Sequence, residues 1–452
     1  MPNDLCLKPM TALASLMDRG QVSSVELTES CLAAIGARNT SLNAFITVLA
    51  DTARAEARQA DEERAHGRVR GPLHGMPVSL KDLIDVAGVA TTAASRLRRS
   101  HRAASDAAIV SRLREAGAVI IGKCNLHEFA FGTTSEDSAW GPVRNPADPR
   151  RSAGGSSGGS AVAVVTGMSA MSIGTDTGGS IRIPAAACGC VGLKPTTGEI
   201  PTDGVVPLSW SLDHVGPLTR SVGDSWMAWH ALSGRPRAAP LRAEDRRSPG
   251  GIRLGFLHEY FCDPIDDQVR RSFEGEIERL RKAGVSIDEV TVPHAGDIAA
   301  VYLHIQLPEA SAYHASAIET RPGDYTAPVR LRLEMGRYVL AEDYVRAQRG
   351  RGVLAAEVDA ALEGRDALIV PTLPIPAPPI GAATVVIGHR SEPVRGLMLR
   401  DTQLFDLTGH PAITMPCAAD ADGMPCGWQL VGRRHATGDL LRLAFSLEAA
   451  AA

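Results

Sequence analysis

Two glycine- and serine-rich runs and one lysine are the residues of this chain best suited to chemistry. The runs span residues 154–160 and 174–182, and Lys81 lies upstream of both. A serine hydroxyl becomes a good nucleophile only when an adjacent base takes its proton, and glycines beside it let the backbone approach a substrate carbonyl closely. The chain therefore supplies two candidate nucleophiles, Ser156 and Ser180, and an amine that could serve as the base.

Lys81 must be neutral if it is to act as a base near pH 7. Its pKa would have to fall from about 10.4 by roughly 3 units through burial and hydroxyl neighbours. That shift corresponds to disfavouring the ammonium form by about 4 kcal/mol of free energy. Arginine could not take this role, because it does not release its proton in proteins. The structural alternative is a salt bridge from Lys81 to Asp82 or Asp85. The presence of the two serine runs favours the base.

The motifs alone leave open which serine is the nucleophile. Residues 154–158 match the Gly-x-Ser-x-Gly elbow of α/β-hydrolases, in which an acid and a histidine follow the serine. Asp366 and His410 could be given those two roles, but nothing singles them out. The elbow also needs a β-strand directly before it, whereas residues 146–153 are polar and contain proline. The elbow interpretation is therefore weak.

The second run suits the binding of an oxyanion. Successive backbone N–H groups of a turn can point into one concavity, and two glycines keep side chains out of it. The expected donors are Thr177, Gly178, Gly179 and Ser180. In acyl transfer each such donor contributes about 2.7 to 4 kcal/mol. Arg182 is expected to fix Asp176 or a neighbouring loop rather than to touch substrate.

Other motif interpretations fit less well. Residues 176–178 match the triplet of aspartic proteases, but no second Asp-Thr-Gly is present to share a proton. Neither glycine run has the pattern of a phosphate-binding loop. His127 and Glu128 lack the second histidine of a zinc motif, so we expect a structural role for His127 and no metal site.

The lysine and the two runs, in this order and with Ser180 24 positions after Ser156, resemble the amidase signature family. The match continues through residues 81–88, 122–130, 141–146, 191–196 and 213–217, with weaker similarity at 370–372, 408–412 and 427–430. It covers nearly the whole chain and is strongest over residues 70–225.

The resemblance implies a role for each residue of the site. Ser180 would be the nucleophile, Ser156 a relay that follows a cis peptide bond, and Lys81 the base. Ser157 and Thr175 would hydrogen-bond the Lys81 amine. The reaction implied is hydrolysis of a C–N bond in a carboxamide through an acyl-enzyme, with no metal or organic cofactor. Esters, anilides and carbamates could form the same acyl-enzyme.

Three residues depart from the family pattern. Asp406 and Asp137 stand where asparagine is usual, and Ala147 replaces a common tryptophan. These departures concern the pocket and hence the substrate. Two rival functions on the same fold are the glutaminase subunit of a transfer-RNA-dependent amidotransferase and a catalytically silent binding protein. The chain is short for that subunit, and residues 350–352 with Asp406 depart from its C-terminal pattern.

The predicted fold is a single large α/β unit with a mixed, mostly parallel sheet covered by helices on both faces. A strand at 78–80, a helix at 107–116 and a strand at 118–121 form a crossover unit typical of such sheets. We expect an N-terminal helical segment at 1–65, a core with the catalytic residues at 66–235, a linker at 236–250, and a C-terminal part at 251–452 that completes the sheet and the pocket.

Further elements follow from local pattern. Ser23 or Ser24 could cap a helix over 25–37, and Asp51 or Thr52 a second one from residue 53. A strand at 252–257, a helix at 267–283 and a strand at 367–370 are also predicted. The proline-dense residues 371–379 can only form a loop.

Bulk composition excludes several classes of protein. A net charge of −4 leaves no excess of basic residues for binding nucleic acid. The sequence has no run of 18 or more apolar residues, so no membrane span is predicted. The N-terminus lacks the pattern of a signal peptide, and eight scattered cysteines indicate free thiols rather than a disulfide framework. We expect a cytoplasmic protein that acts on a small-molecule amide. The oligomeric state is left open, with a homodimer as one arrangement.

Overall fold

One mixed β-sheet of 11 strands runs through the computed structural model, which describes residues 4–235, 239–417 and 423–450. Its strands are β1 (Phe45–Val48), β2 (Pro77–Lys81), β3 (Val119–Cys124), β4 (Met171–Asp176), β5 (Val191–Lys194), β6 (His214–Thr219), β7 (Arg253–Leu257), β8 (Ser286–Val290), β9 (Ala367–Pro371), β12 (Ala412–Pro416) and β13 (Gly427–Val431). They lie in the order β1-β3-β2-β4-β6-β5-β12-β13-β9-β7-β8. A separate hairpin consists of β10 (Thr384–Ile387) and β11 (Arg390–Pro393).

The sheet is parallel toward its two ends and antiparallel through its middle. β2 pairs in parallel with β3 and β4, and β7 does so with β8 and β9. The consecutive pairs from β4 to β9, and the edge pair β1–β3, are antiparallel. The predicted α/β unit with a mixed sheet is confirmed, but antiparallel pairs are more numerous than expected among the described strands. Strands that follow each other closely, such as β12 and β13, can pair antiparallel without a crossover helix.

Helices surround this sheet. In chain order they are α1 (Met10–Asp18), α2 (Ser24–Leu42), α3 (Ala50–Ala65), α4 (Ala108–Glu115), α5 (Gly158–Val165), α6 (Arg182–Cys188), α7 (Val222–Ser233), α8 (Asp267–Lys282), α9 (Ile298–Thr320), α10 (Ala327–Gly336), α11 (Ala341–Ala361), α12 (Val394–Arg400), α13 (Gln403–Thr408) and α14 (Thr437–Ala450). No helix within the described ranges is both long enough and apolar enough to cross a bilayer.

Both faces of the sheet are covered, as predicted. In β9, Leu368 and Val370 belong to a hydrophobic cluster that includes residues of α6, α9, α11 and α13. Ile369, which lies between them, belongs to a second cluster that includes residues of α5, α7 and α14. Because successive strand side chains point to opposite faces, the two clusters lie on opposite sides of the sheet.

The N-terminal segment is helical with one exception. Ser23 caps α2, since its hydroxyl accepts from the Glu26 N–H and the Glu26 carboxylate accepts from the Ser23 N–H. The predicted cap of the second helix is wrong, because α3 begins at Ala50 and Asp51 lies inside its first turn. The edge strand β1 was not predicted. Its four residues are too few to show a strand periodicity.

The other local predictions agree with the structure to within a few residues. The strands expected at 78–80, 118–121, 252–257 and 367–370 are β2, β3, β7 and β9, and the helices expected at 107–116 and 267–283 are α4 and α8. The part from residue 251 onward contributes five strands to the same sheet, with β12 paired to β5. Residues 236–238 of the predicted linker lie outside the described residues, and the proposed boundaries at 65, 235 and 250 stay predictions.

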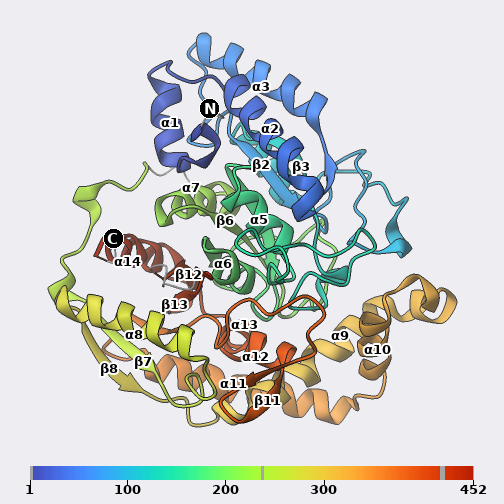
Figure 1. Ribbon diagram of the computed structural model, residues 1–452, viewed down its shortest axis with the longest axis vertical. Helices are drawn as coiled ribbons and strands as arrows, with labels where there is room; N and C mark the ends of the chain where they lie inside the picture. Colours follow the sequence, from blue (N-terminus) through green and yellow to red (C-terminus); the bar gives the residue numbers. More distant parts are fainter. Residues whose placement is uncertain (1–3, 236–238, 418–422, 451–452) are drawn as a thin grey trace.

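The central parallel strands bring the chemistry-bearing residues to one edge of the sheet. Val78, Ser79 and Leu80 of β2 pair with residues 171–173 of β4, so Lys81 and Asp176 end adjacent parallel strands. The two serine runs lead into α5 and α6, which contact each other. In Figure 1 these helices lie between the N-terminal helices α1–α3 and the C-terminal half of the chain, drawn in yellow to red.

Candidate active site

Lys81 ends β2 and is fully buried. Its Nζ donates to Ser156 Oγ and to Thr175 Oγ1, both at 2.7 Å. Burial disfavours the ammonium form and lowers the pKa of Lys81 to about 7, although the carboxylates of Asp176 and Asp213 act in the opposite direction. At neutral pH a large fraction of this amine is therefore uncharged.

The two expected partners of the amine differ in what they contact. Thr175 is hydrogen-bonded to Lys81, as expected. The Ser157 hydroxyl instead donates to the Thr175 carbonyl at 3.2 Å and lies 3.4 Å from the Thr175 nitrogen, which donates to it. Within the described residues Ser157 makes no hydrogen bond to Lys81, so it acts on the amine only by holding Thr175 in place.

The backbone of Ser156 is held from two sides. The Gly155–Ser156 peptide bond is cis, as the resemblance implies. The Ser156 carbonyl accepts from the His127 N–H and from the Ser135 hydroxyl, each at 3.2 Å. A Cβ on Gly155 would lie 2.7 Å from the Ser135 nitrogen, so only glycine fits there. Sequence reasoning missed Ser135, which lies 21 residues before Ser156 and outside both runs.

Ser180 is joined to the first serine run by a backbone hydrogen bond. The Ser157 N–H donates to the Ser180 carbonyl at 3.2 Å, which joins the two serine runs. Within the described part of the chain the Ser180 hydroxyl makes no hydrogen bond, and the residue is 6% exposed. The structure therefore brings Lys81, Ser156 and Ser180 together, and leaves Ser180 Oγ available to a ligand.

The Asp176 carboxylate organises the turn that carries Ser180. It accepts from the N–H groups of Gly179 at 2.5 Å and Ile181 at 3.1 Å. Gly179 is therefore not free to bind an oxyanion. The other three expected donors, Thr177, Gly178 and Ser180, give their N–H groups to no acceptor among the described residues. We accordingly restrict the proposed oxyanion hole to these three.

Arg182 fixes that carboxylate and is itself fully buried. Its Nε donates to Asp176 Oδ2 at 3.0 Å, and its Nη2 donates to Asp406 Oδ2 at 2.6 Å. Burial favours a neutral Asp176, but the Arg182 charge outweighs it and holds the pKa of Asp176 well below its usual range. The expected contact between Arg182 and Asp176 is thus present. Arg182 supports the turn and does not line the cavity beside it.

Comparison with known proteins is consistent with this site. A family model described as Amidase matches residues 26–441. The chain is 40% identical to an amidase of Pseudomonas putida, over 92% of this chain and 90% of that protein. It is 34% identical to a glutamyl-tRNA(Gln) amidotransferase subunit of Koribacter versatilis, over 99% of each. A crystal structure of an amidase superposes with a TM-score of 0.92 at 37% identity, over 98% of this chain and 100% of the other. The chain belongs to the amidase family.

Membership of the amidase family confirms the resemblance drawn from the motifs, and identifies the chain as a hydrolase that acts on amide bonds. The roles of the individual residues and the substrate are a separate question. In this amidase, the geometry around the turn that carries Ser180 bears on both the residue roles and the substrate.

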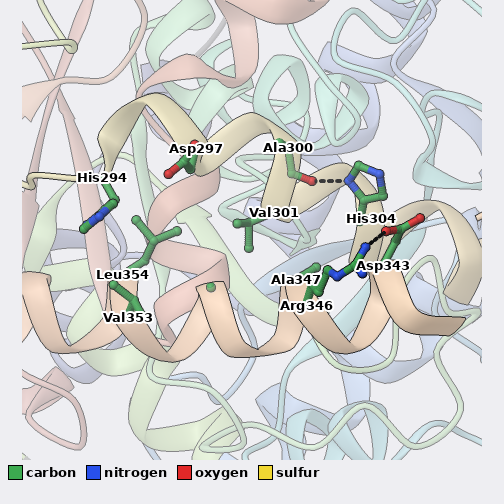
Figure 2. Close-up of a pocket in the computed structure, with 11 residues that line it drawn as sticks. His294, Asp297, Ala300, Val301, His304, Asp343, Arg346, Ala347, Val353 and Leu354 are labelled. Carbon is green, nitrogen blue, oxygen red and sulfur yellow. Dashed lines mark hydrogen bonds and ion pairs between the residues drawn. The ribbon is translucent and has the colours of Figure 1, made fainter. Parts of the chain in front are cut away.

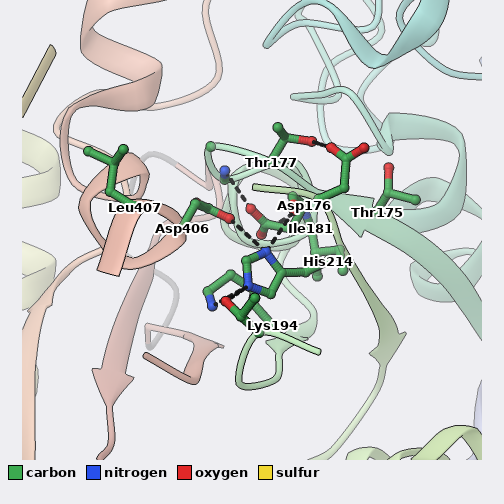
Figure 3. A network of polar contacts seen from close by, with 12 residues as sticks. Thr175, Asp176, Thr177, Ile181, Lys194, His214, Asp406 and Leu407 are labelled. Carbon is green, nitrogen blue, oxygen red and sulfur yellow. Dashed lines mark hydrogen bonds and ion pairs between the residues drawn. The ribbon is translucent and has the colours of Figure 1, made fainter. Parts of the chain in front are cut away.

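A buried polar network extends from the turn of the amidase to residues of the C-terminal half (Figure 3). Asp406, found where asparagine is usual, contacts Arg182 and lies 3.4 Å from His214 Nδ1. On the other side of this ring, His214 Nε2 is 3.4 Å from Lys194 Nζ. Burial raises the pKa of Asp406, as does the neighbouring Asp176, and burial lowers the pKa of Lys194 to about 7. The network braces Asp176, and in the described part of the chain no hydrogen bond joins it to Lys81.

Asp213 is a second residue that sequence reasoning left without a role. Its Oδ1 accepts from the Thr177 hydroxyl at 2.6 Å, and its Oδ2 accepts from the Leu208 N–H at 2.9 Å. Burial raises its pKa to about 6. Asp213 thereby ties Thr177, one of the proposed oxyanion donors, to the strand that follows. The motif at 213–217 contains it, but only the structure shows its partner.

The alternative serine–histidine–acid site is not assembled. His410 Nε2 is 3.1 Å from Asp359 Oδ1, whereas Asp366 accepts from the Arg247 side chain and the Arg253 N–H. Residues 146–153 contain no strand before the supposed elbow. His127, expected to be structural, lies with Nε2 3.1 Å from Asp137 Oδ2. The geometry therefore disfavours a histidine base at Ser156.

A cavity of about 650 Å³ adjoins the turn that carries Ser180. Its lining includes Tyr302, Arg395 and Gln403. A Cβ on Gly178 would lie 2.5 Å from Tyr302 Oη, so the wall of the cavity contacts the turn directly. Thr402, next to Gln403, donates its hydroxyl to the Gly178 carbonyl at 2.6 Å. The described lining of this cavity includes none of Lys81, Ser156 and Ser180, so the cavity meets the candidate site at the turn, through Tyr302.

A second cavity, of about 380 Å³, lies between α9 and α11 (Figure 2). Its lining includes His294, Asp297, His304 and Arg346. In Figure 2 the His304 ring is hydrogen-bonded to the Ala300 carbonyl one turn before it. The described lining of this second cavity contains none of Lys81, Ser156 and Ser180, and it lacks Tyr302, the residue through which the larger cavity meets the turn.

Proposed function

We propose that this chain hydrolyses the C–N bond of a carboxamide through an acyl-enzyme on Ser180. The observation that carries the proposal is the environment of Lys81. Within the described residues its buried amine contacts two hydroxyls and no carboxylate, and one of these hydroxyls belongs to Ser156, whose neighbour Ser157 is hydrogen-bonded to Ser180. A lysine placed in this way can be neutral at pH 7 and can accept a proton.

The acylation step needs one base, one relay and one nucleophile. Neutral Lys81 accepts the Ser156 proton while Ser156 accepts the proton of Ser180. Ser180 Oγ forms a bond to the substrate carbonyl carbon, and the carbonyl oxygen becomes an oxyanion. The N–H groups of Thr177, Gly178 and Ser180 stabilise that charge, which is greater in the transition state than in the bound amide.

Departure of the amine reverses the proton path. The Ser156 hydroxyl gives its proton to the nitrogen as the C–N bond breaks, and Lys81 returns a proton to Ser156. Water then attacks the Ser180 ester by the same relay and releases the acid. Esters, aryl amides and carbamates can enter the same path, since each places a carbonyl carbon before Ser180. We expect a small-molecule substrate and a cytoplasmic site of action. Whether the chain forms a homodimer can be tested by measuring its molar mass in solution with light scattering.

Two serine variants and one control test the assignment. Ser180→Ala should abolish acyl-enzyme formation, measured as the mass increase of the protein after mixing with an activated aryl ester. Ser156→Ala should acylate slowly but detectably if it only relays protons. Ser160→Ala removes another buried serine of the same run and should leave turnover within a few-fold of wild type. Substantial turnover by Ser180→Ala would move the nucleophile to Ser156. A wild-type chain that never acylates would favour the silent binding protein.

A second candidate function is the glutaminase subunit of a transfer-RNA-dependent amidotransferase. It is favoured by the 34% identity to such a subunit over 99% of both chains. Ammonia released by the isolated chain from glutamine, compared with ammonia released from simple aliphatic amides, separates the two. Hydrolysis of glutamine alone would support the glutaminase, and turnover of simple amides would support an independent amidase.

A further inference from the structure

Three arginines line the cavity beside the catalytic turn, and they differ in their partners. Arg390 is exposed and lies 3.4 Å from the Asp263 carboxylate. Arg400 donates to the Tyr260 carbonyl at 2.9 Å and to the Asp263 carbonyl at 2.6 Å. Arg395 has neither a hydrogen bond nor an ion pair anywhere in the described part of the chain. Its guanidinium donors are therefore available to a ligand.

The Arg395 guanidinium is held in position by an aromatic ring. Its Cζ lies 5.7 Å from the centre of the Phe131 ring. The Arg332 Cζ lies 5.1 Å from the same centre, and its Nη2 donates to the Phe131 carbonyl at 2.6 Å. Stacking orients Arg395 without using its N–H groups. Two guanidinium groups on one ring also make this end of the cavity electropositive.

Arg395 lines the same cavity as Tyr302, and Tyr302 contacts the proposed oxyanion turn at Gly178. Ser180 itself does not line this cavity, so a ligand bound to Ser180 would have to extend past Tyr302 to reach Arg395. A guanidinium in a partly enclosed cavity costs free energy when it has no partner, and it binds a carboxylate through two parallel hydrogen bonds.

We infer that Arg395 binds a carboxylate on the amide substrate, so that acidic amides are preferred over neutral amides of the same size. The inference rests on the proposed function, because it assigns a substrate class to the same site. Arginine suits this role better than lysine, since its planar fork matches the geometry of a carboxylate.

The experiment compares kcat/KM within two matched pairs of amides. Succinamate and pentanamide differ by a carboxylate on the acyl side, and N-acetylglycine and N-propylacetamide differ by a carboxylate on the amine side. Wild type should prefer the acidic member of one pair at least tenfold, and the pair concerned locates the carboxylate. Arg395→Gln should remove that preference and Arg395→Lys should restore part of it. Arg390→Gln, at an arginine already paired with Asp263, should keep the wild-type ratio.

Equal kcat/KM values for both members of both pairs in wild type would overturn the inference while leaving the amidase proposal intact. An undiminished preference in Arg395→Gln would overturn it as well. If wild type hydrolyses none of the four amides, the proposed function has failed, and the anion site is then tested by binding. Succinate should raise the Tm of wild type but not that of Arg395→Gln. If succinate does not raise the Tm of the wild-type chain in this binding experiment, the inference is overturned as well.

Discussion

Lys81 and Lys123 are both fully buried on adjacent parallel strands, yet their surroundings differ. Lys123 Nζ lies 2.8 Å from Asp82 Oδ1 and 3.2 Å from the Thr91 hydroxyl. Among the residues that the structure describes, the Lys81 amine is hydrogen-bonded only to the hydroxyls of Ser156 and Thr175. A carboxylate at contact distance favours the ammonium form, whereas burial against hydroxyls allows the neutral amine. Burial alone therefore does not make a lysine a base. What distinguishes Lys81 from Lys123 is that its described contacts include no carboxylate.

Asp82 follows Lys81 directly in sequence but pairs with the other lysine. Successive side chains of an extended segment point in opposite directions, so Lys81 and Asp82 cannot share one side of the strand end. The Thr92 N–H also donates to the Asp82 carboxylate, at 3.0 Å. By engaging Asp82, Lys123 and Thr92 keep that carboxylate away from Lys81, and the two lysine sites depend on each other.

The comparison predicts the largest effect for Lys81→Met. Loss of the base should lower kcat/KM for an aryl amide by roughly 10² to 10⁴, and the loss should be smaller for the matched aryl ester, whose leaving group needs little protonation. The free energy of unfolding should fall by at most about 1.5 kcal/mol, because an apolar chain of similar length replaces an amine without a carboxylate partner. Steady-state kinetics and urea unfolding measure both. Equal losses on amide and ester would mean that Lys81 serves structure alone.

Lys123→Met should show the opposite pattern. It leaves the Asp82 charge buried without its partner, and such a change lowers the free energy of unfolding by about 3 to 5 kcal/mol. The variant that still folds should retain far more amide turnover per folded molecule than Lys81→Met. The double variant Lys123→Met with Asp82→Asn is the control, because it removes the orphaned charge and should recover part of the stability. If Lys81→Met destabilises the fold as much as Lys123→Met, the contrast between the two sites is wrong.

The sequence predicted the parts of the site that depend on local pattern. A short apolar strand before Lys81 and the two serine runs were enough to locate the proposed base and two candidate nucleophiles, and the resemblance to the amidase signature family then assigned Ser156 and Ser180 their roles. The strand β1 was missed because its four residues show no clear period. The excess of antiparallel pairs was missed because the pairing of β12 with β5 joins segments more than 200 residues apart.

The rest of the site depends on contacts that no local pattern contains. Ser135 holds Ser156 through a carbonyl, and Asp213 holds Thr177 across 36 residues. The Gly179 N–H donates to Asp176 because of the backbone conformation of the turn. Glycine allows many backbone conformations, so the sequence does not determine this one. Arg395 lines the cavity because residues of α9 and α12, which are far apart in the sequence, form its walls together. Each of these residues is present in the sequence, but the residues that surround it in the fold cannot be read from local pattern.

The pH dependence of kcat/KM tests whether Lys81 must be neutral for turnover. If neutral Lys81 is required, kcat/KM should be level above its pKa of about 7 and should fall about tenfold per pH unit below it. His410 should not contribute this limb, since burial lowers its pKa to about 4. Lys194, with a pKa of about 7, and Asp213, with a pKa of about 6, also titrate in this range. Lys194→Met and Asp213→Asn are therefore the necessary controls, and both should keep the limb near pH 7. A profile that is flat between pH 5 and 8 would contradict a neutral lysine base.

The smallest effect is expected for Thr175→Val, which removes one of the two hydroxyls on the Lys81 amine. A hydrogen bond to the ammonium favours the charged form, so its loss should lower the pKa of Lys81 further. The acid limb should therefore move to lower pH, by up to about 1 unit, since that corresponds to about 1.4 kcal/mol. The plateau should fall only a few-fold, because the contact with Ser156 remains. Thr414→Val, at a buried threonine on β12, is the matched control and should leave the limb in place. A limb that moves to higher pH, or a loss of turnover as large as that of Lys81→Met, would mean that Thr175 carries the proton and that Ser156 is not the relay.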